Sequence, residues 1–162
     1  MVTIITGPIN SGKTTRMLET FETYNNGDGF VSLKLTENRT IKGFDIMKLS
    51  TGETMAFIRR VEDLPEYWIE NSRLGPYSFS GKAVDWVEGE IEKIISMGKK
   101  PVFLDEIGIL EIRGKCFYKA VRRMIDSGRD TYLSTRDEFL DDIKLEFGLV
   151  DAEVILTGER YA

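Results

Sequence analysis

The chain has 162 residues, of which 41% are hydrophobic, enough for one domain with a buried core. It contains no His, which excludes imidazole acid–base catalysis and His-ligated metals, and its single cysteine, Cys116, cannot form an intrachain disulfide. The net charge of −5 argues against bulk electrostatic attraction to nucleic acid. With no membrane-length apolar run and no signal peptide, we expect a cytoplasmic protein without a membrane partner.

A glycine-rich loop follows the first predicted strand, residues 2–6. Residues 7–14 have the spacing Gly-x-x-x-x-Gly-Lys-Thr of a phosphate-binding P-loop, or Walker A motif. Apolar residues then recur at helical spacing, at Met17, Leu18, Phe21 and Tyr24. A strand, a glycine loop and a helix in this order form the context that the motif requires.

The residue types of this loop suit a triphosphate. Gly7 and Gly12 allow the backbone to turn tightly and to approach an anion, while backbone N–H groups converge on the phosphate oxygens. Lys13 is expected to reach the β- and γ-phosphates, and the Thr14 hydroxyl to bind Mg²⁺. We therefore expect nucleotide contacts from Gly7, Pro8, Ile9, Asn10, Ser11, Gly12, Lys13, Thr14 and Thr15.

The middle third of the chain lacks a helical period. Residues 25–29 form a turn, and residues 30–35 are predicted as a second strand. Two further apolar segments, 44–49 and 54–59, flank a four-residue turn and predict a β-hairpin. Residues 64–68 and 75–77 are predicted as irregular connections. We expect a β-rich insertion at about 36–81 within a single domain, 1–162.

Helices alternate with strands in the last half. Asp85 and Glu88 form a capping pair that predicts the start of a helix, which Gly98 ends. An apolar strand, 102–106, ends in two acids. Further apolar periodicity predicts helices at 117–125 and 139–147 and strands at 131–134 and 152–156. This alternation predicts an α/β fold with a mainly parallel sheet and helices on both faces.

Ligands of such sheets bind at the carboxyl ends of the strands. Asp105 ends the strand that we expect to lie closest to the P-loop once the core strands are paired, where P-loop NTPases hold Mg²⁺; a capping or salt-bridged acid is the alternative. Glu106 is placed to orient and deprotonate water that attacks the γ-phosphate, which favours hydrolysis. Glu111 is the rival base, or a charged residue on a surface turn.

Two arginines are candidates for supplying positive charge at the transferred phosphate. Arg136 is the first candidate and Arg160 the second; a surface ion pair is the alternative for each.

These residues also carry a family resemblance. Residues 7–15, the segment Asp-Glu-Ile-Gly-Ile-Leu-Glu at 105–111 and Lys115-x-Phe117 resemble the small nucleoside-triphosphatases of thermophilic bacteria and archaea, which have a human cancer-related relative. The resemblance implies an additional-strand P-loop fold of the RecA-like type and Mg²⁺-dependent hydrolysis of ATP, GTP and other nucleoside triphosphates. It also implies that Lys13 and Thr14 bind phosphate and metal, that Asp105 is the Walker B acid, and that Glu106 or Glu111 is the catalytic acid.

Two segments depart from that family: residues 78–82 replace a shorter link, and residues 157–160 lack the expected proline and asparagine. These departures affect base recognition more than phosphate chemistry. A nucleotide or small-molecule kinase is the first alternative function, because the β-rich insertion could hold an acceptor. The second is a nucleotide-gated module that binds RNA or protein, which the acidic net charge disfavours.

Overall fold

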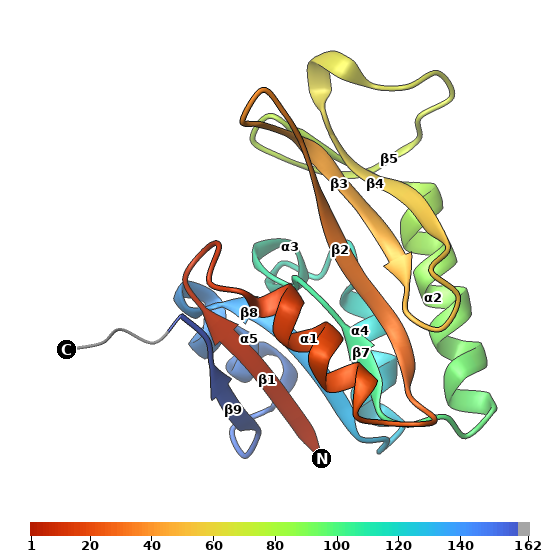
Figure 1. Cartoon of the computed structure of the whole chain (residues 1–162), viewed down its shortest axis with the longest axis vertical. Coiled ribbons are helices and arrows are strands. Elements are labelled where there is room, and N and C mark those ends of the chain that lie inside the picture. The colour runs from red at the N-terminus through yellow and green to blue at the C-terminus, as the bar shows by residue number, and fades with distance from the viewer. Residues whose placement is uncertain (159–162) are drawn as a thin grey trace.

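The computed structural model describes residues 1–158, and its central feature is one mixed β-sheet (Figure 1). Its strands follow the order β5-β6-β4-β3-β2-β7-β8-β1-β9. They are β1 (Val2–Gly7), β2 (Asp28–Glu37), β3 (Thr40–Lys48), β4 (Thr54–Arg60), β5 (Glu70–Leu74), β6 (Tyr77–Ser80), β7 (Val102–Leu104), β8 (Thr131–Arg136) and β9 (Glu153–Leu156). The helices are α1 (Lys13–Glu22), α2 (Gly81–Ser96), α3 (Ile109–Ile112), α4 (Tyr118–Asp126) and α5 (Leu140–Phe147), with 3-10 turns at η1 (Val61–Asp63) and η2 (Asp137–Phe139).

The sheet joins a parallel half to an antiparallel extension. β1 pairs in parallel with β8 and β9, and β7 pairs in parallel with β2 and β8. From β2 onward, β3, β4, β6 and β5 add to the sheet in antiparallel pairs. Figure 1 shows this extension rising away from α1, α4 and α5. The arrangement confirms the predicted α/β fold with a hairpin-rich insertion.

The strand before Asp105 is not the immediate neighbour of the P-loop strand. β8 lies between β7 and β1, with Leu133 opposite both Ile4 and Leu104. The carboxyl end of β7 still lies at the P-loop, as expected, because Asp105 accepts a hydrogen bond from the Thr14 hydroxyl. A strand inserted at this place is the additional strand of the P-loop fold type that the resemblance implies.

Helices cover both faces of the parallel half. Successive strand residues point to opposite faces, so Ile5 and Phe103 pack with Met17 of α1, while Ile4 and Leu104 pack with α2, α4 and α5. Figure 1 shows α1 in front of the sheet and α5 behind it. Within residues 1–158, no helix has the length and apolar character needed to span a bilayer. The covered faces leave the carboxyl ends of the strands as the accessible edge.

The insertion and the helix that follows it differ in detail from the sequence prediction. β3 and β4 confirm the predicted hairpin, but residues 70–80 form a second hairpin whose turn contains Gly75, not an irregular connection. α2 begins at Gly81, four residues before the predicted capping pair, because the Ala83 N–H donates to the Ser80 hydroxyl at 3.1 Å. The predicted start at Asp85 was wrong because Ser80 supplies an earlier cap.

Candidate active site

The P-loop connects the end of β1 to the start of α1. Gly12 precedes the helix in a left-handed conformation, with φ of 89°. The first hydrogen bond of the helix joins the Arg16 N–H to the Gly12 carbonyl at 3.0 Å, so the N–H groups of residues 13–15 lie ahead of the helical ladder. N–H groups at the positive end of a helix attract anions. The side chain of Ile9 is exposed, so its part in binding would come from the backbone.

The P-loop also rests against the segment that follows β9. The Thr157 N–H donates to the Thr6 carbonyl at 2.8 Å, and the hydroxyls of Thr157 and Ser11 hydrogen-bond at 2.7 Å. Gly7 lies within this contact. A Cβ atom at position 7 would meet the Thr157 Oγ1 at 2.4 Å and the Thr157 carbonyl oxygen at 2.6 Å. The first motif glycine is therefore required by close packing of two backbone segments.

Replacing Gly7 with alanine should lower the free energy of unfolding by about 1–3 kcal/mol, because the loop must move away from Thr157. The matched control is Gly89→Ala, since position 89 is exposed within α2 and a Cβ there has open space. The free energy of unfolding of this control should rise by up to about 1 kcal/mol, because alanine favours a helix more than glycine does. Urea unfolding measures both, and equal stability of the two variants would contradict the packing described for Gly7.

Lys13 is folded back into its own loop. Its Nζ donates to the Pro8 carbonyl at 2.9 Å and to the Gly7 carbonyl at 3.3 Å, and the side chain is 4% exposed. A second ammonium approaches from β2, where Lys34 hydrogen-bonds the Asn10 side chain. Two cations thus lie at the loop together with the helix N–H groups, and the combination favours a strongly charged anion.

The Thr14 hydroxyl connects the P-loop to the end of β7. It donates to the Asp105 carboxylate at 2.6 Å, and the same carboxylate accepts from the Ser32 N–H at 3.1 Å and from the Ser134 hydroxyl. Asp105 is fully buried. Burial raises the pKa of Asp105, and the hydrogen bonds from Ser134, Thr14 and Ser32 offset part of that rise. Three neighbouring elements therefore hold one carboxylate in a fixed orientation.

Glu106 directly follows this buried acid. Its backbone lies in the left-handed region, with φ of 59°, and its N–H donates to the Ser134 hydroxyl at 2.8 Å. A non-glycine residue in this conformation is strained, and such strain concentrates at functional sites. The side chain is exposed, but it lies in a concave part of the surface where it has less water around it. This desolvation is the larger cause that raises the pKa of Glu106, and repulsion from Asp105 is the second.

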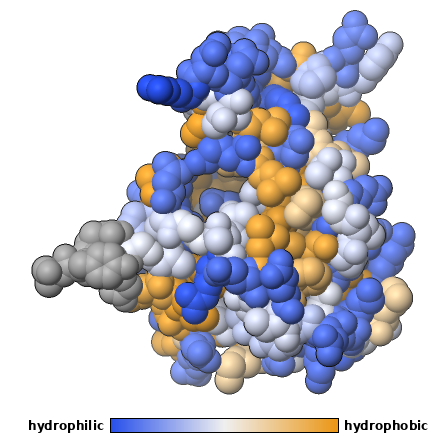
Figure 2. Space-filling model, viewed as in Figure 1, coloured by the Kyte–Doolittle hydropathy of each residue, from blue (hydrophilic) through white to orange (hydrophobic). Residues whose placement is uncertain are grey.

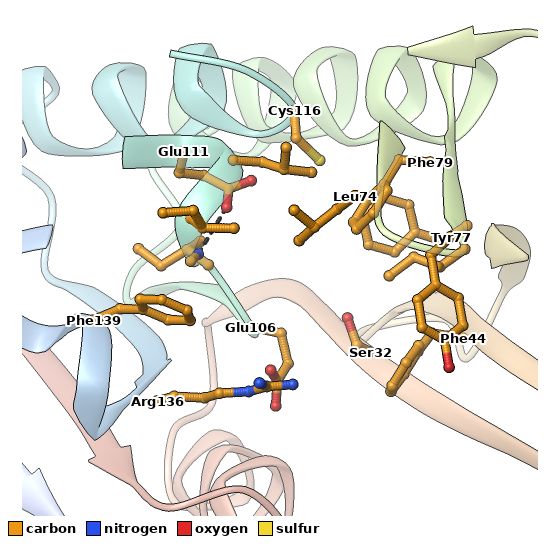
Figure 3. Close-up of a pocket in the computed structure, with 16 residues that line it drawn as sticks. Ser32, Phe44, Leu74, Tyr77, Phe79, Glu106, Glu111, Cys116, Arg136 and Phe139 are labelled. Atoms are coloured by element: carbon orange, nitrogen blue, oxygen red, sulfur yellow. Dashed lines mark hydrogen bonds between the residues drawn. The ribbon is translucent and has the colours of Figure 1, made fainter. Parts of the chain in front are cut away.

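Arg136, at the end of β8, faces Glu106. Figure 3 shows the two side chains directed toward each other, and the charge of Arg136 is among the effects that lower the pKa of Glu106. The guanidinium also lies 3.7 Å from the Glu138 carboxylate, which is a long ion pair at a half-exposed position. The structure therefore brings Arg136 to the site without tying it tightly to a surface partner.

Glu111, the rival base, is placed differently. The side chain is 4% exposed, and its two oxygens accept hydrogen bonds from the Gly108 N–H at 2.7 Å and the Phe117 N–H at 3.0 Å. Burial raises the pKa of Glu111 in spite of these bonds. Figure 3 shows Glu111 and Glu106 at separate places along the same wall of a cavity. This carboxylate connects the start of α3 to the start of α4.

Cys116 packs beside Glu111 and should not act as a nucleophile. Burial, followed by the nearby charge of Glu111, raises the pKa of the Cys116 thiol well above its ordinary value. Each unit of such a shift lowers the thiolate fraction about tenfold. Iodoacetamide at pH 8 should therefore leave the folded protein unlabelled and modify Cys116 in urea, as mass spectrometry can show. Rapid labelling of the native protein would contradict this placement.

Three residues of the site were not singled out by the sequence: Ser32, Lys34 and Ser134. The signal for Ser134 was present, because it ends the predicted strand 131–134 and the carboxyl ends of parallel strands lie at the ligand edge of the sheet. Ser32 lies within its strand, so no such signal marked it. Nothing local distinguished Lys34 from a solvent-exposed strand residue. Arg160, the second arginine candidate, lies outside the described residues.

The fold and this edge define a P-loop NTPase: a glycine-rich P-loop, a buried acid bonded to its threonine, and one additional strand between their two strands. A protein-family model described as NTPase matches residues 2–152. The chain belongs to this NTPase family, which confirms the resemblance seen in its motifs.

Known relatives agree with this membership. The chain is 29% identical to the nucleoside-triphosphatase THEP1 of Thermotoga maritima over 147 residues, covering 89% of this chain and 80% of that protein. It is 29% identical to THEP1 of Thermotoga petrophila over 162 residues, covering 95% and 84%. The fold resembles THEP1 from Aquifex aeolicus, with TM-score 0.71, 21% identity and coverage of 97% and 90%. It also resembles a human cancer-related nucleoside triphosphatase, with TM-score 0.65, 21% identity and coverage of 95% and 87%.

Proposed function

We propose that this protein hydrolyses nucleoside triphosphates, including ATP and GTP, to the diphosphate and phosphate with Mg²⁺ as cofactor. The observation that carries this proposal is the 2.6 Å hydrogen bond from the Thr14 hydroxyl to Asp105, with Glu106 as the next residue. This contact supports the proposal because it joins the P-loop to a carboxylate that is followed by a second acid, all at one edge of the sheet. The relatives named as nucleoside-triphosphatases support the same reaction.

The oxygen donors fit Mg²⁺. Thr14 and Asp105 would hold the ion, Asp105 by orienting the Thr14 hydroxyl as well as by its charge. In residues 1–158 there is no cluster of three or more His, Cys, Asp or Glu side chains that could enclose a metal. Mg²⁺ suits such a site, because it is usually bound through one or two protein groups together with substrate phosphates and water. When bound, it neutralises charge on the β- and γ-phosphates.

The other residues supply binding and proton transfer. The Lys13 ammonium and the N–H groups of residues 13–15 would donate hydrogen bonds to phosphate oxygens when a nucleotide is bound. Glu106 would orient the attacking water and accept its proton while the bond from the γ-phosphorus to the bridging oxygen breaks. Arg136 would stabilise the charge of the transferred group. We assign no proton transfer to Glu111, because both of its oxygens bind backbone N–H groups.

We further propose that the whole chain works as one NTPase domain. The strands of the insertion continue the sheet that holds Asp105, since β3 pairs along β2 and β2 pairs with β7. Ser32 of β2 also donates to Asp105, so the insertion and the catalytic edge share a strand.

Phosphate release from ATP, GTP, CTP and UTP tests the proposed function. We expect acceptor-independent release from all four with Mg²⁺, loss of release with excess EDTA, and recovery on adding Mg²⁺ in excess of EDTA. The reason is that the residues proposed for the site would contact the triphosphate and not the base. Release that continues in EDTA would contradict the role of Mg²⁺, and no release from any triphosphate would contradict the function.

A further inference from the structure

A cavity of about 190 Å³ opens beside Glu106 and Arg136, and none of residues 7–15 lines it. Aromatic and aliphatic side chains of the insertion form one wall: Phe44, Phe57, Ile58, Leu74, Tyr77 and Phe79. Residues 106–111 form the opposite wall. Figure 2 shows the surface hollowed between the antiparallel extension and the rest of the molecule. The cavity thus continues the catalytic edge on the side away from the P-loop.

Ser32 lies where the cavity meets the catalytic edge. Its N–H donates to Asp105 at 3.1 Å, while its hydroxyl, on a side chain 4% exposed, has no hydrogen-bond partner among the described residues. Figure 3 shows this hydroxyl directed into the cavity. A buried polar group without a partner costs free energy, and a ligand atom that pairs with it would remove that cost.

We propose that this cavity binds a neutral, single-ring aromatic molecule that carries a hydroxyl group, and that this hydroxyl replaces water as the acceptor of the γ-phosphate. The inference rests on the proposed function of the site. A cavity of about 150 Å³ with apolar walls can hold benzene, so this cavity is large enough for one ring and a short substituent. Aromatic walls favour a ring through edge-to-face contacts.

The charges of the cavity select a neutral acceptor. Glu106 and Arg136 lie together at the catalytic end, and the Glu111 carboxylate already binds two backbone N–H groups. The remaining wall of β3–β6 is apolar, so it offers no cation for an acceptor phosphate. A hydroxyl that points toward Glu106 would therefore be the reacting group of the ligand.

The transfer step balances without a further reactant. The hydroxyl oxygen attacks the γ-phosphorus, and the bond from that phosphorus to the β–γ bridging oxygen breaks. The nucleoside diphosphate leaves with the bonding electron pair, and the hydroxyl proton passes to Glu106. The products are a phosphate monoester of the ring compound and the diphosphate.

Binding can be tested in the nucleotide-free protein with benzyl alcohol and toluene as probes. We expect saturable NMR shifts of the methyl groups of Ile58, Leu74 and Ile107, with benzyl alcohol bound about 2- to 10-fold more tightly because it pairs with Ser32. Ser32→Ala should bind both probes equally. Leu74→Trp should abolish binding, whereas Leu145→Trp, at a position 83% exposed, should not. Absence of saturable shifts in the wild type, or a hydroxyl preference that survives Ser32→Ala, would overturn the inference.

Transfer is tested with ATP and Mg²⁺, with and without saturating benzyl alcohol. We expect benzyl phosphate to appear by mass spectrometry while release of free phosphate falls. Phosphate release without benzyl alcohol, combined with no benzyl phosphate in its presence, would overturn the acceptor inference and leave the hydrolase proposal intact. No ADP under either condition would instead contradict the proposed function itself.

Discussion

Replacing Lys13 with alanine should lower the rate of triphosphate hydrolysis by about 10²–10³-fold, the usual effect of removing one preorganised charge from a reacting group. The buried ammonium lies between the Gly7 and Pro8 carbonyls, at the loop that would surround the phosphates. Alanine removes this charge and leaves the helix N–H groups in place. Steady-state phosphate release with ATP and Mg²⁺ measures the loss.

The matched control for this substitution is Lys119→Ala. Lys119 is exposed on α4, so replacing it with alanine removes the same charge from the protein without changing the loop. We expect the control to retain wild-type turnover. Melting curves should show that both variants are folded, because Lys13 is bonded only to carbonyls of its own loop among the described residues. Equal turnover of the two variants would contradict the role of Lys13.

Glu106→Gln should lower turnover by about 10²–10⁴-fold, the range of a lost general base, while leaving KM nearly unchanged. Glutamine keeps the size of the side chain and can still hydrogen-bond, but it cannot accept a proton from water. Turnover and KM for ATP with saturating Mg²⁺ provide the measurement. Full activity in this variant would exclude Glu106 as the base.

Glu111→Gln separates the two candidate acids. The glutamine oxygen can accept a hydrogen bond from one of the two N–H groups, of Gly108 and Phe117, but the amide NH₂ would then face the other. We expect a loss of about 1–3 kcal/mol in the free energy of unfolding, with turnover per folded molecule retained. A stable Glu111→Gln variant that has lost turnover would instead identify Glu111 as the base.

The sequence predicted the centre of the site because its signals are local. The spacing of Gly7, Gly12, Lys13 and Thr14 is a contiguous motif, and its strand and helix context could be recognised from periodicity alone. Asp105 was predicted from its position after an apolar strand. The structure brings Asp105 to Thr14 although the two residues are far apart in the chain, because both follow strands of one parallel sheet.

The sequence could not predict features that depend on distant partners. Ser134 contacts both Asp105 and the Glu106 N–H only because β8 inserts between β1 and β7, an order that chain sequence does not determine. The cap of α2 was assigned to Asp85 because Ser80 lies at the end of a strand that had not been predicted. For Glu111 the sequence left open a rival base and a surface acid, because its partners, the Gly108 and Phe117 N–H groups, depend on how α3 and α4 begin.

Hydrolysis of ATP in ¹⁸O-enriched water tests the central claim most directly. If Glu106 activates water for attack on the γ-phosphorus, each phosphate released should carry one ¹⁸O atom from solvent, and the ADP should carry none. Mass spectrometry of the two products gives the result. Solvent ¹⁸O in the ADP, or phosphate released without ¹⁸O, would contradict the account.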